Sequence, residues 1–321
     1  MLAIPPAHPN PGLSGPRMAL LSLEFPAVTT ARGSTDYDAG SDRDQWIMGP
    51  SSLFLDSLAL RPTKDNFFST DKQPTTKKGV ERFNRLQGLV STLSTGPVFP
   101  SDGIGSSDVP LILRSCNAGG VLLRPDRAAT SLDSNILAKA LARGTGAPEP
   151  GELESSSSTV STGNHDADGP AVHTYLYLLA AQTNATTVQP GQLIPGYSGA
   201  PKYLAVESNS TAVAVAFGPA PLKLPATNRW TFNFWTFAPV LANGYAFFGE
   251  VATKWIAVSN DRFAKVVATS TGLEVDAVGT PGEVVVMAWV PPGNNMAVVS
   301  MECTVSGSGS FTARIPAKTC H

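Results

Sequence analysis

Apolar residues in the N-terminal part of the chain form short continuous runs and longer helical stripes. The run from Leu20 to Val28 predicts a buried strand. Residues 47–60 and 79–95 carry apolar side chains three and four positions apart, which predicts two amphipathic helices. Shorter apolar runs, typical of strands, follow at 111–113 and 121–123. Strands that alternate with helices favour an α/β region with parallel strands.

The pattern changes from Ala171 onward, where short apolar segments are bounded by Gly, Pro or Asn. Short strands about ten residues apart are typical of an antiparallel β-sandwich. Asn243-Gly244, between two aromatic runs, predicts a tight hairpin. We expect strands at 172–179, 203–206, 212–217, 230–237, 245–248, 255–258, 265–268, 273–278, 284–289 and 297–304.

The aromatic run 230–237 has two interpretations. Its indole and phenyl rings would form a platform for sugar rings if one face were open to solvent. Strict alternation instead places Trp230, Phe232 and Phe234 on one face and leaves Trp235 and Phe237 on the other. This pattern favours a core strand that is buried on both faces.

Composition divides the chain into four parts. Residues 1–16 contain five prolines and predict a disordered lead-in. Residues 17–143 form the expected α/β region. Residues 144–169 have almost no apolar content, which predicts a disordered linker or insertion. Residues 170–321 form the expected C-terminal β-sandwich domain.

Charge and motif content exclude several classes of function. The net charge is −2 and only 15% of residues are charged, so we expect neither a nucleic-acid partner nor binding to an acidic membrane. No run of about 18 apolar residues occurs, which argues against a membrane span. The N-terminus has no signal-peptide pattern, although sequons at Asn184 and Asn209 would be used in a secretory path. No phosphate-binding loop or metal-ligand spacing is present, so we expect no cofactor and no metal.

The chain contains three cysteines, none in a C-x-x-C spacing. Cys303 and Cys320 flank a segment rich in Gly and Ser and would bridge two strands in an oxidising compartment. Spacing alone does not fix the Cα separation that a disulfide requires, so two free thiols fit the sequence as well. Cys116 follows an apolar run and is expected to be a buried, inert thiol.

The loop after the first predicted strand carries the strongest candidate chemistry. It contains Arg32 and, four residues later, Asp36. A carboxyl group at the end of a strand, next to a guanidinium, is typical of the catalytic rim of a barrel enzyme. Glycoside cleavage needs such a carboxyl group as a proton donor and a second one across the sugar. The spacing by itself is equally typical of a surface ion pair. The other loop carboxylates of this region are Asp38, Asp42, Asp44, Asp65 and Asp102.

Three segments resemble raffinose synthases and related α-galactosidases. Residues 26–37 are similar to the stretch that carries the acid/base aspartate of these enzymes. The resemblance gives the acid/base position to Asp36 and a substrate contact to Arg32. Residues 61–67 resemble a rim segment whose aspartate, here Asp65, binds sugar hydroxyls, although Lys64 replaces the family's tryptophan. Residues 90–102 resemble the last helix and strand of the barrel.

The resemblance implies a retaining hydrolase or glycosyl transferase that acts on α-linked hexosides. The fold it implies is a partial (β/α) barrel, made of the last βα units, followed by the β-sandwich. The family's nucleophile is an aspartate upstream of the acid/base, yet residues 1–35 hold no aspartate and one glutamate, Glu24. We therefore expect a fragment that is inactive alone, from a truncated gene or a split enzyme.

Two further expectations complete this hypothesis. An incomplete barrel would leave strand edges and apolar helix faces exposed, which predicts self-association. The alternative function is a non-catalytic carbohydrate-binding or structural protein, in which the β-domain is the working part.

Overall fold

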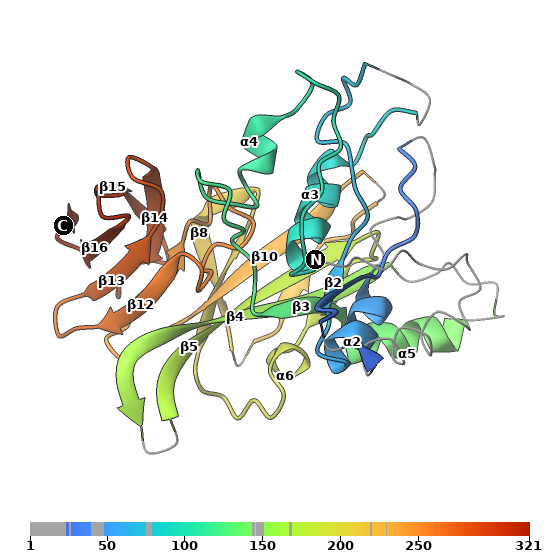
Figure 1. Ribbon diagram of the computed structural model, residues 1–321. Helices are drawn as coiled ribbons and strands as arrows, with labels where there is room; N and C mark the ends of the chain where they lie inside the picture. The colour runs from blue at the N-terminus through green and yellow to red at the C-terminus, as the bar shows by residue number, and fades with distance from the viewer. Residues whose placement is uncertain are drawn as a thin grey trace.

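The computed structural model describes residues 24–25, 27–39, 48–74, 79–142, 145, 151–166, 169–218, 220–228 and 230–321, without the side chains of residues 165 and 166. Strands dominate the described part (Figure 1). The N-terminal elements are β1 (Thr30–Arg32), α2 (Gly49–Ser57), β2 (Arg61–Thr63), α3 (Asn84–Leu93), α4 (Val109–Ile112), β3 (Arg127–Ser131) and α5 (Asp133–Ala142).

The remaining elements are nearly all strands. They are β4 (Glu152–Asp166), β5 (Gly169–Ala181), β6 (Thr186–Val188), α6 (Pro190–Leu193), β7 (Tyr203–Glu207), β8 (Ser210–Phe217), β9 (Leu222–Leu224), β10 (Phe232–Pro239), β11 (Ala246–Gly249), β12 (Phe263–Ala268), β13 (Leu273–Val278), β14 (Val284–Val290), β15 (Val299–Thr304), β16 (Ser310–Ile315) and β17 (Thr319–Cys320). Within the described residues, no helix is long and apolar enough to cross a bilayer.

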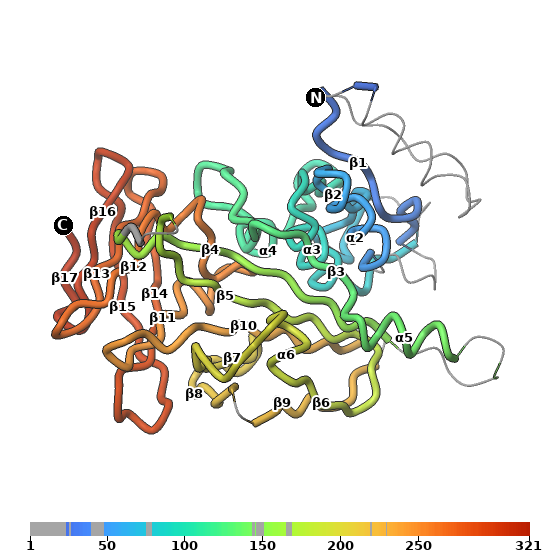
Figure 2. The backbone as a smooth tube through the Cα atoms, turned by 90° about the horizontal axis from the view of Figure 1, so that it is seen from below, coloured from blue at the N-terminus to red at the C-terminus, as the bar shows by residue number. Residues whose placement is uncertain are grey.

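A ten-stranded sheet organises the molecule, in the order β17-β16-β13-β12-β4-β5-β10-β7-β8, with β3 also paired to β4. In Figures 1 and 2, its long strands β4, β5 and β10 run through the centre of the molecule. The segment with β1, β2, α2, α3 and α4 lies on one side of these strands, and α6, β6 and β9 lie on the other. Both faces of the sheet are therefore covered.

The expected partial (β/α) barrel is wrong. Strands β1 and β2 do pair in parallel around α2, but each is three residues long and they form a separate two-stranded sheet. The run 111–113 begins inside helix α4 instead of a strand, because Asp108 accepts a hydrogen bond from the Leu111 N–H at 3.0 Å and Pro110 occupies the first turn. No (β/α) barrel is evident in the described residues.

The polar segment 152–166 is strand β4, so the disorder expected for residues 144–169 is wrong there. Strand β4 pairs along its length with β5, and also with β3 and β12. These neighbours satisfy the backbone hydrogen bonds of a Ser-rich run that offers little apolar surface of its own. Alternate side chains, including Glu152, Glu154, Ser156 and Ser158, are buried.

Strand β5 contributes to two hydrophobic clusters. Tyr175 and Tyr177 belong to the large cluster that also contains the helix α3 residue Leu89. Leu176 and Leu178, which alternate with them, belong to a second cluster under α6, β6 and β9. Strand β10 divides in the same way, with Phe234 in the first cluster and Phe237 in the second. The prediction that this aromatic strand is buried on both faces is confirmed for these two rings.

Most of the predicted C-terminal strands are present, and 273–278 matches β13 residue for residue. The Asn243-Gly244 turn joins β10 to β11: Leu241 donates to the Tyr245 carbonyl, and Gly244, at φ +84°, donates back to Leu241. The run 255–258 is buried but is not a strand. Its apolar side chains fill the core while its backbone bends.

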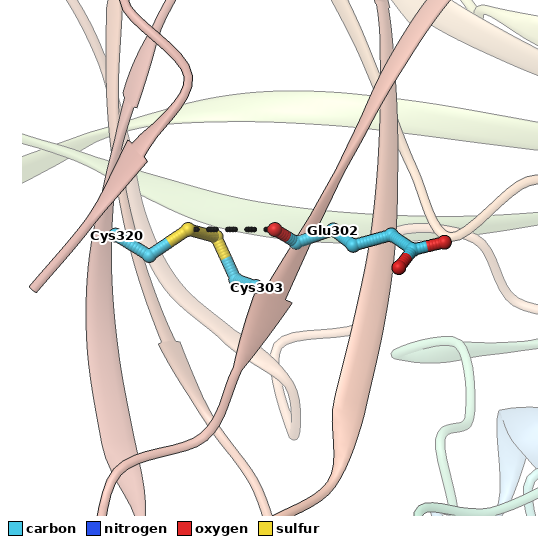
Figure 3. The surroundings of a disulfide bond; sticks show 3 residues. All are labelled: Glu302, Cys303 and Cys320. Carbon is cyan, nitrogen blue, oxygen red and sulfur yellow. Dashed lines mark hydrogen bonds between the residues drawn. A yellow bond between two sulfur atoms is a disulfide. The ribbon is translucent and has the colours of Figure 1, made fainter.

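A disulfide joins Cys303 on β15 to Cys320 on β17, with the two Cα atoms 5.8 Å apart (Figure 3). The bond connects the separate three-stranded sheet β11-β14-β15 to the edge of the ten-stranded sheet. Cys116 is a free, buried thiol. Burial raises its pKa, which keeps the thiol protonated.

A buried ion cluster fixes the C-terminal strands to the loop after α4. Arg262, 1% exposed, donates its Nε–H to Glu250 at 2.8 Å and pairs with Glu283 at 2.5 Å. Glu283 also accepts the Ala118 N–H at 3.2 Å. Each charge in the cluster is thereby paired inside the core, as a buried charge requires.

Candidate functional site

The sequence-predicted residues meet at the carboxyl ends of β1 and β2. The two strands pair in parallel with Arg32 opposite Thr63, and the Gly33 N–H continues the ladder to the Thr63 carbonyl at 2.9 Å. Helix α2 holds the pair from one side, where its Leu55 packs with Ala31. Because parallel strands end at the same edge, the loop after Arg32 lies next to the loop after Thr63.

Arg32 bridges two carboxylates that come from these two loops. Its NH2 group is bonded to Asp36, and its NH1 group lies 3.0 Å from Asp65 Oδ2. The Asp36 side chain is 85% exposed, whereas the Arg32 and Asp65 side chains are only about one fifth exposed. The structure therefore brings Arg32, Asp36 and Asp65 into one cluster, with Asp36 on the solvent side.

Reciprocal hydrogen bonds lock the two loops together. The Tyr37 N–H donates to Asp65 Oδ2 at 2.8 Å, and the Asp65 N–H donates to Ser34 Oγ at 2.8 Å. Each loop thus supplies a side-chain acceptor for a backbone donor of the other. This arrangement fixes Asp65 and Arg32 before any ligand arrives, which is the preorganisation a binding site needs.

Tyr37 and Glu81 form the floor beneath the cluster. The Tyr37 hydroxyl donates to Glu81 Oε2 at 2.7 Å and accepts the Phe68 N–H at 3.1 Å. Burial, reinforced by the nearby Glu81 carboxylate, raises the pKa of Tyr37 above its ordinary value. The phenol is therefore a neutral hydrogen-bond donor over the physiological pH range.

Lys64, between Thr63 of β2 and Asp65, is 1% exposed. Its Nζ lies 5.2 Å from the centre of the Tyr37 ring and 5.8 Å from that of Phe67. It donates to the carbonyls of Asp65 at 3.3 Å and Asn66 at 3.4 Å. Burial lowers the pKa of Lys64 to about 8, although the carboxylates of Glu81 and Asp65 act in the opposite direction.

Sequence reasoning did not find the roles of Tyr37, Lys64 and Glu81. Nothing in the local pattern marks a lysine or a glutamate as buried, because charged residues are usually exposed. The aromatic residue after Asp36 was the only available signal for Tyr37, and it did not indicate a contact with residue 81. These three side chains meet only because the loop before α3 passes beneath the ends of β1 and β2.

The other candidate carboxylates have different positions. Asp102 accepts the Ser69 N–H at 2.7 Å, the Ser69 hydroxyl at 2.6 Å and the Gln73 side-chain amide at 2.7 Å, so it braces a loop. Asp42 and Asp44 lie outside the described residues, as does most of the predicted strand 20–28. In the described part of the chain, no group of three or more His, Cys, Asp or Glu side chains is placed to hold a metal ion.

The cluster has the chemistry of a polar ligand site. Asp36 offers an exposed carboxyl group that can accept hydrogen bonds from hydroxyls or donate a proton, and Arg32 adds a fixed positive charge. A comparison with protein-family models finds no family that matches this sequence, and a search of curated proteins finds no similar one.

Proposed function

We propose that the cluster of Arg32, Asp36 and Asp65 binds an α-linked hexoside, in a protein related to retaining glycoside hydrolases and glycosyl transferases. The observation that carries the proposal is the single guanidinium that bridges carboxylates from two loops at the same strand edge. Asp36 takes the acid/base position, and Arg32 and Asp65 contact sugar hydroxyls. The three segments similar to α-galactosidases and raffinose synthases support the choice of substrate class.

The charge pattern suits a neutral, hydroxyl-rich ligand. Carboxylates are strong acceptors for sugar hydroxyls, and an arginine donates to ring and linkage oxygens. The cluster already balances one positive charge against two negative ones, so a strongly charged ligand has less to gain. Because Asp65 is held by the Tyr37 N–H, ligand binding does not require it to be ordered first.

We expect binding without turnover by this chain alone. A retaining mechanism needs two carboxyl groups about 5–5.5 Å apart on opposite sides of the sugar. The resemblance assigns Asp65 to sugar hydroxyls and not to the nucleophile, and its carboxylate is held by Arg32 and by the Tyr37 N–H. A single acid without an opposing nucleophile accelerates glycoside cleavage by only about 10²–10⁴-fold.

Binding of raffinose, melibiose and galactose, measured by ligand-observed NMR and calorimetry, tests the proposal. The main variant is Asp36→Asn, because an 85% exposed side chain can lose its charge with little effect on folding. Asp71→Asn, at another exposed loop aspartate, is the matched control. We expect Asp36→Asn to weaken binding by at least about tenfold and the control to leave it unchanged.

Two outcomes contradict the proposal. Affinity that survives both Asp36→Asn and Arg32→Gln would mean that sugar binds elsewhere, as in a non-catalytic binding protein. Clear turnover of p-nitrophenyl α-galactoside by the purified chain would refute the expected inactivity. Turnover that Asp36→Asn abolishes would still support the acid/base role of Asp36.

A further inference from the structure

A second candidate site lies at the start of helix α3, opposite the turn between β7 and β8. It is a pocket of about 240 Å³ that shares no lining residue with the cluster of Arg32, Asp36 and Asp65. It is formed where the N-terminal segment meets the ten-stranded sheet. Its lining residues are Arg82, Phe83, Asn84, Arg85, Leu86, Asn209, Trp230, Thr231 and Phe232.

An exposed indole forms one wall of this pocket. Trp230 is 56% exposed, so the expected core position of this residue is wrong. Strand β10 begins only at Phe232, and Trp230 lies before it. Its ring stacks on Phe83, with centroids 5.1 Å apart and an interplanar angle of 25°. The stack fixes the indole while leaving much of its surface open to solvent, as in a platform for a ligand ring.

Positive charge gathers around the same wall. The Arg82 guanidinium lies 5.9 Å from the centre of the Trp230 ring, and Arg85 donates to Asn209 Oδ1 at 3.2 Å. Arg114 does not line the pocket, but it contacts the same Trp255 ring as Arg85, with their guanidinium carbons 4.0 and 5.9 Å from the ring centre. None of the lining residues is acidic. Two guanidinium groups on a pocket whose lining contains no carboxylate favour an anionic ligand.

The exposed indole favours a sugar over a simple anion, because it can stack on the apolar face of a sugar ring. The polar side chains of Asn209 and Thr231 are already hydrogen-bonded, Asn209 to Arg85 and Glu207 and Thr231 to Asn228, so the indole and the guanidinium groups carry the recognition. The volume lies below the roughly 300–1,000 Å³ of pockets that hold drug-sized ligands, so a single ring fits better than a nucleotide. Glu207 is close by, but its carboxylate is engaged by the backbone and side-chain amides of Asn209.

We propose that this pocket binds an anionic monosaccharide, a uronate or a sugar phosphate. The sugar ring lies against Trp230, and its acidic group lies between the guanidinium groups of Arg82 and Arg85. The site is independent of the proposed function, because neither its residues nor its ligand charge coincide with those of the Arg32 cluster.

Titration of the full chain with D-galacturonate, D-galactose 6-phosphate, D-galactose and inorganic phosphate tests this proposal. Tryptophan fluorescence and ligand-observed NMR report the binding. We expect at least one anionic sugar to bind about tenfold more tightly than galactose and than inorganic phosphate. Added salt should weaken that binding, because the acidic group is held at an exposed, screened site.

Four variants make the result specific. Trp230→Ala and Arg82→Gln should each weaken binding of the anionic sugar by at least about tenfold, since both side chains are exposed and lie on the pocket. Arg314→Gln, an exposed arginine on β16, is the matched control and should change nothing. Arg32→Gln should also leave this binding intact, which separates the pocket from the Arg32 cluster.

The proposal is overturned if galactose binds as tightly as the anionic sugars, or if Arg82→Gln has no effect. Equal binding of inorganic phosphate that is insensitive to Trp230→Ala would identify a simple anion site and would also overturn it. Preference for galacturonate over galactose 6-phosphate, or the reverse, decides between the two sources of negative charge.

Discussion

A buried glutamate on β4 should make the stability of this protein depend on pH. Glu154 is 2% exposed, and its Oε1 accepts the Gly49 N–H at 2.7 Å and also bonds the Met48 backbone. Helix α2 begins at Gly49 and has no side-chain cap of its own at Met48. Glu154 therefore supplies the N-terminal cap of the helix that positions β1 and β2.

Burial, reinforced by the neighbouring Glu152 carboxylate, raises the pKa of Glu154 to about 8. The Gly49 and Met48 N–H groups and the charge of Lys139 act in the opposite direction but do not cancel the effect. In the unfolded chain the group titrates at about its ordinary pKa of 4.5. Between these two values the folded state holds a proton that the unfolded state has released.

This difference in bound protons determines whether the protein becomes more or less stable as pH rises. Because the folded state binds more protons between pH 4.5 and 8, the free energy of unfolding falls as pH rises through this interval. The folding equilibrium constant falls by up to roughly tenfold for each pH unit. Over the whole interval, the free energy of unfolding falls by at most about 5 kcal/mol. Below pH 4.5 the contribution is fully present, and above pH 8 the loss levels off.

Glu154→Gln removes the titration while keeping the shape and a hydrogen-bond acceptor. We expect the variant and the wild type to have similar stability at pH 5, and the variant to be increasingly more stable toward pH 8. Urea denaturation followed by circular dichroism at pH 5, 6, 7 and 8 measures the difference. His173, whose pKa burial lowers, titrates in both proteins and so cancels in this comparison.

Glu302→Gln, at an exposed position on β15, is the control and should give a curve parallel to the wild type. A constant gap between Glu154→Gln and the wild type at every pH would refute the reasoning. So would a gap that narrows as pH rises, because the sign of the linkage would then be reversed.

Three further predictions follow from buried groups. Replacing Arg262 by Met leaves two buried carboxylates unpaired and should lower the free energy of unfolding by about 3–5 kcal/mol in urea titrations, with wild-type-like stability as the refuting result. Cys303→Ser removes the disulfide, which closes a loop with a sequence separation of 17, and should lower the free energy of unfolding by about 3 kcal/mol. The wild type in reducing agent should be destabilised by the same amount. Because burial lowers the pKa of Lys64 to about 8, wild-type stability should rise between pH 8 and 10, and Lys64→Met should remove that rise. If the stability of Lys64→Met still rises between pH 8 and 10, another titrating group causes the rise and the prediction is wrong.

Local sequence patterns were sufficient to predict those features that depend on residues close together in the chain. The apolar stripe of 79–95 predicted helix α3, and the alternation in 230–237 predicted a strand with two buried faces. The Asn-Gly turn at 243–244 needs a positive φ at glycine, which the sequence supplies directly. The spacing of Arg32 and Asp36 is compatible with an ion pair and with a catalytic rim, and the ion pair is present.

Other features depended on partners that are distant in the chain. The Ser-rich run 152–166 becomes a strand only because β3, β5 and β12 satisfy its backbone. The alternation of apolar runs and helical stripes in the N-terminal region, together with the resemblance, suggested a barrel, yet the parallel strands β1 and β2 form a separate pair beside a larger sheet. A periodic pattern reports which side of an element is apolar, but it does not report which strand lies next to it.

In the candidate site, too, some features depend on the local sequence and others on contacts between distant segments. The sequence by itself indicated Arg32, Asp36 and Asp65 as candidates, because the spacing of Arg32 and Asp36 after an apolar run and the resemblance of residues 61–67 single them out. Only the tertiary structure decided that one guanidinium bridges both aspartates, that Lys64 is buried beneath them, and that Trp230 is open to solvent. Burial and charge pairing are properties of contacts between distant segments, and no single stretch of sequence contains them.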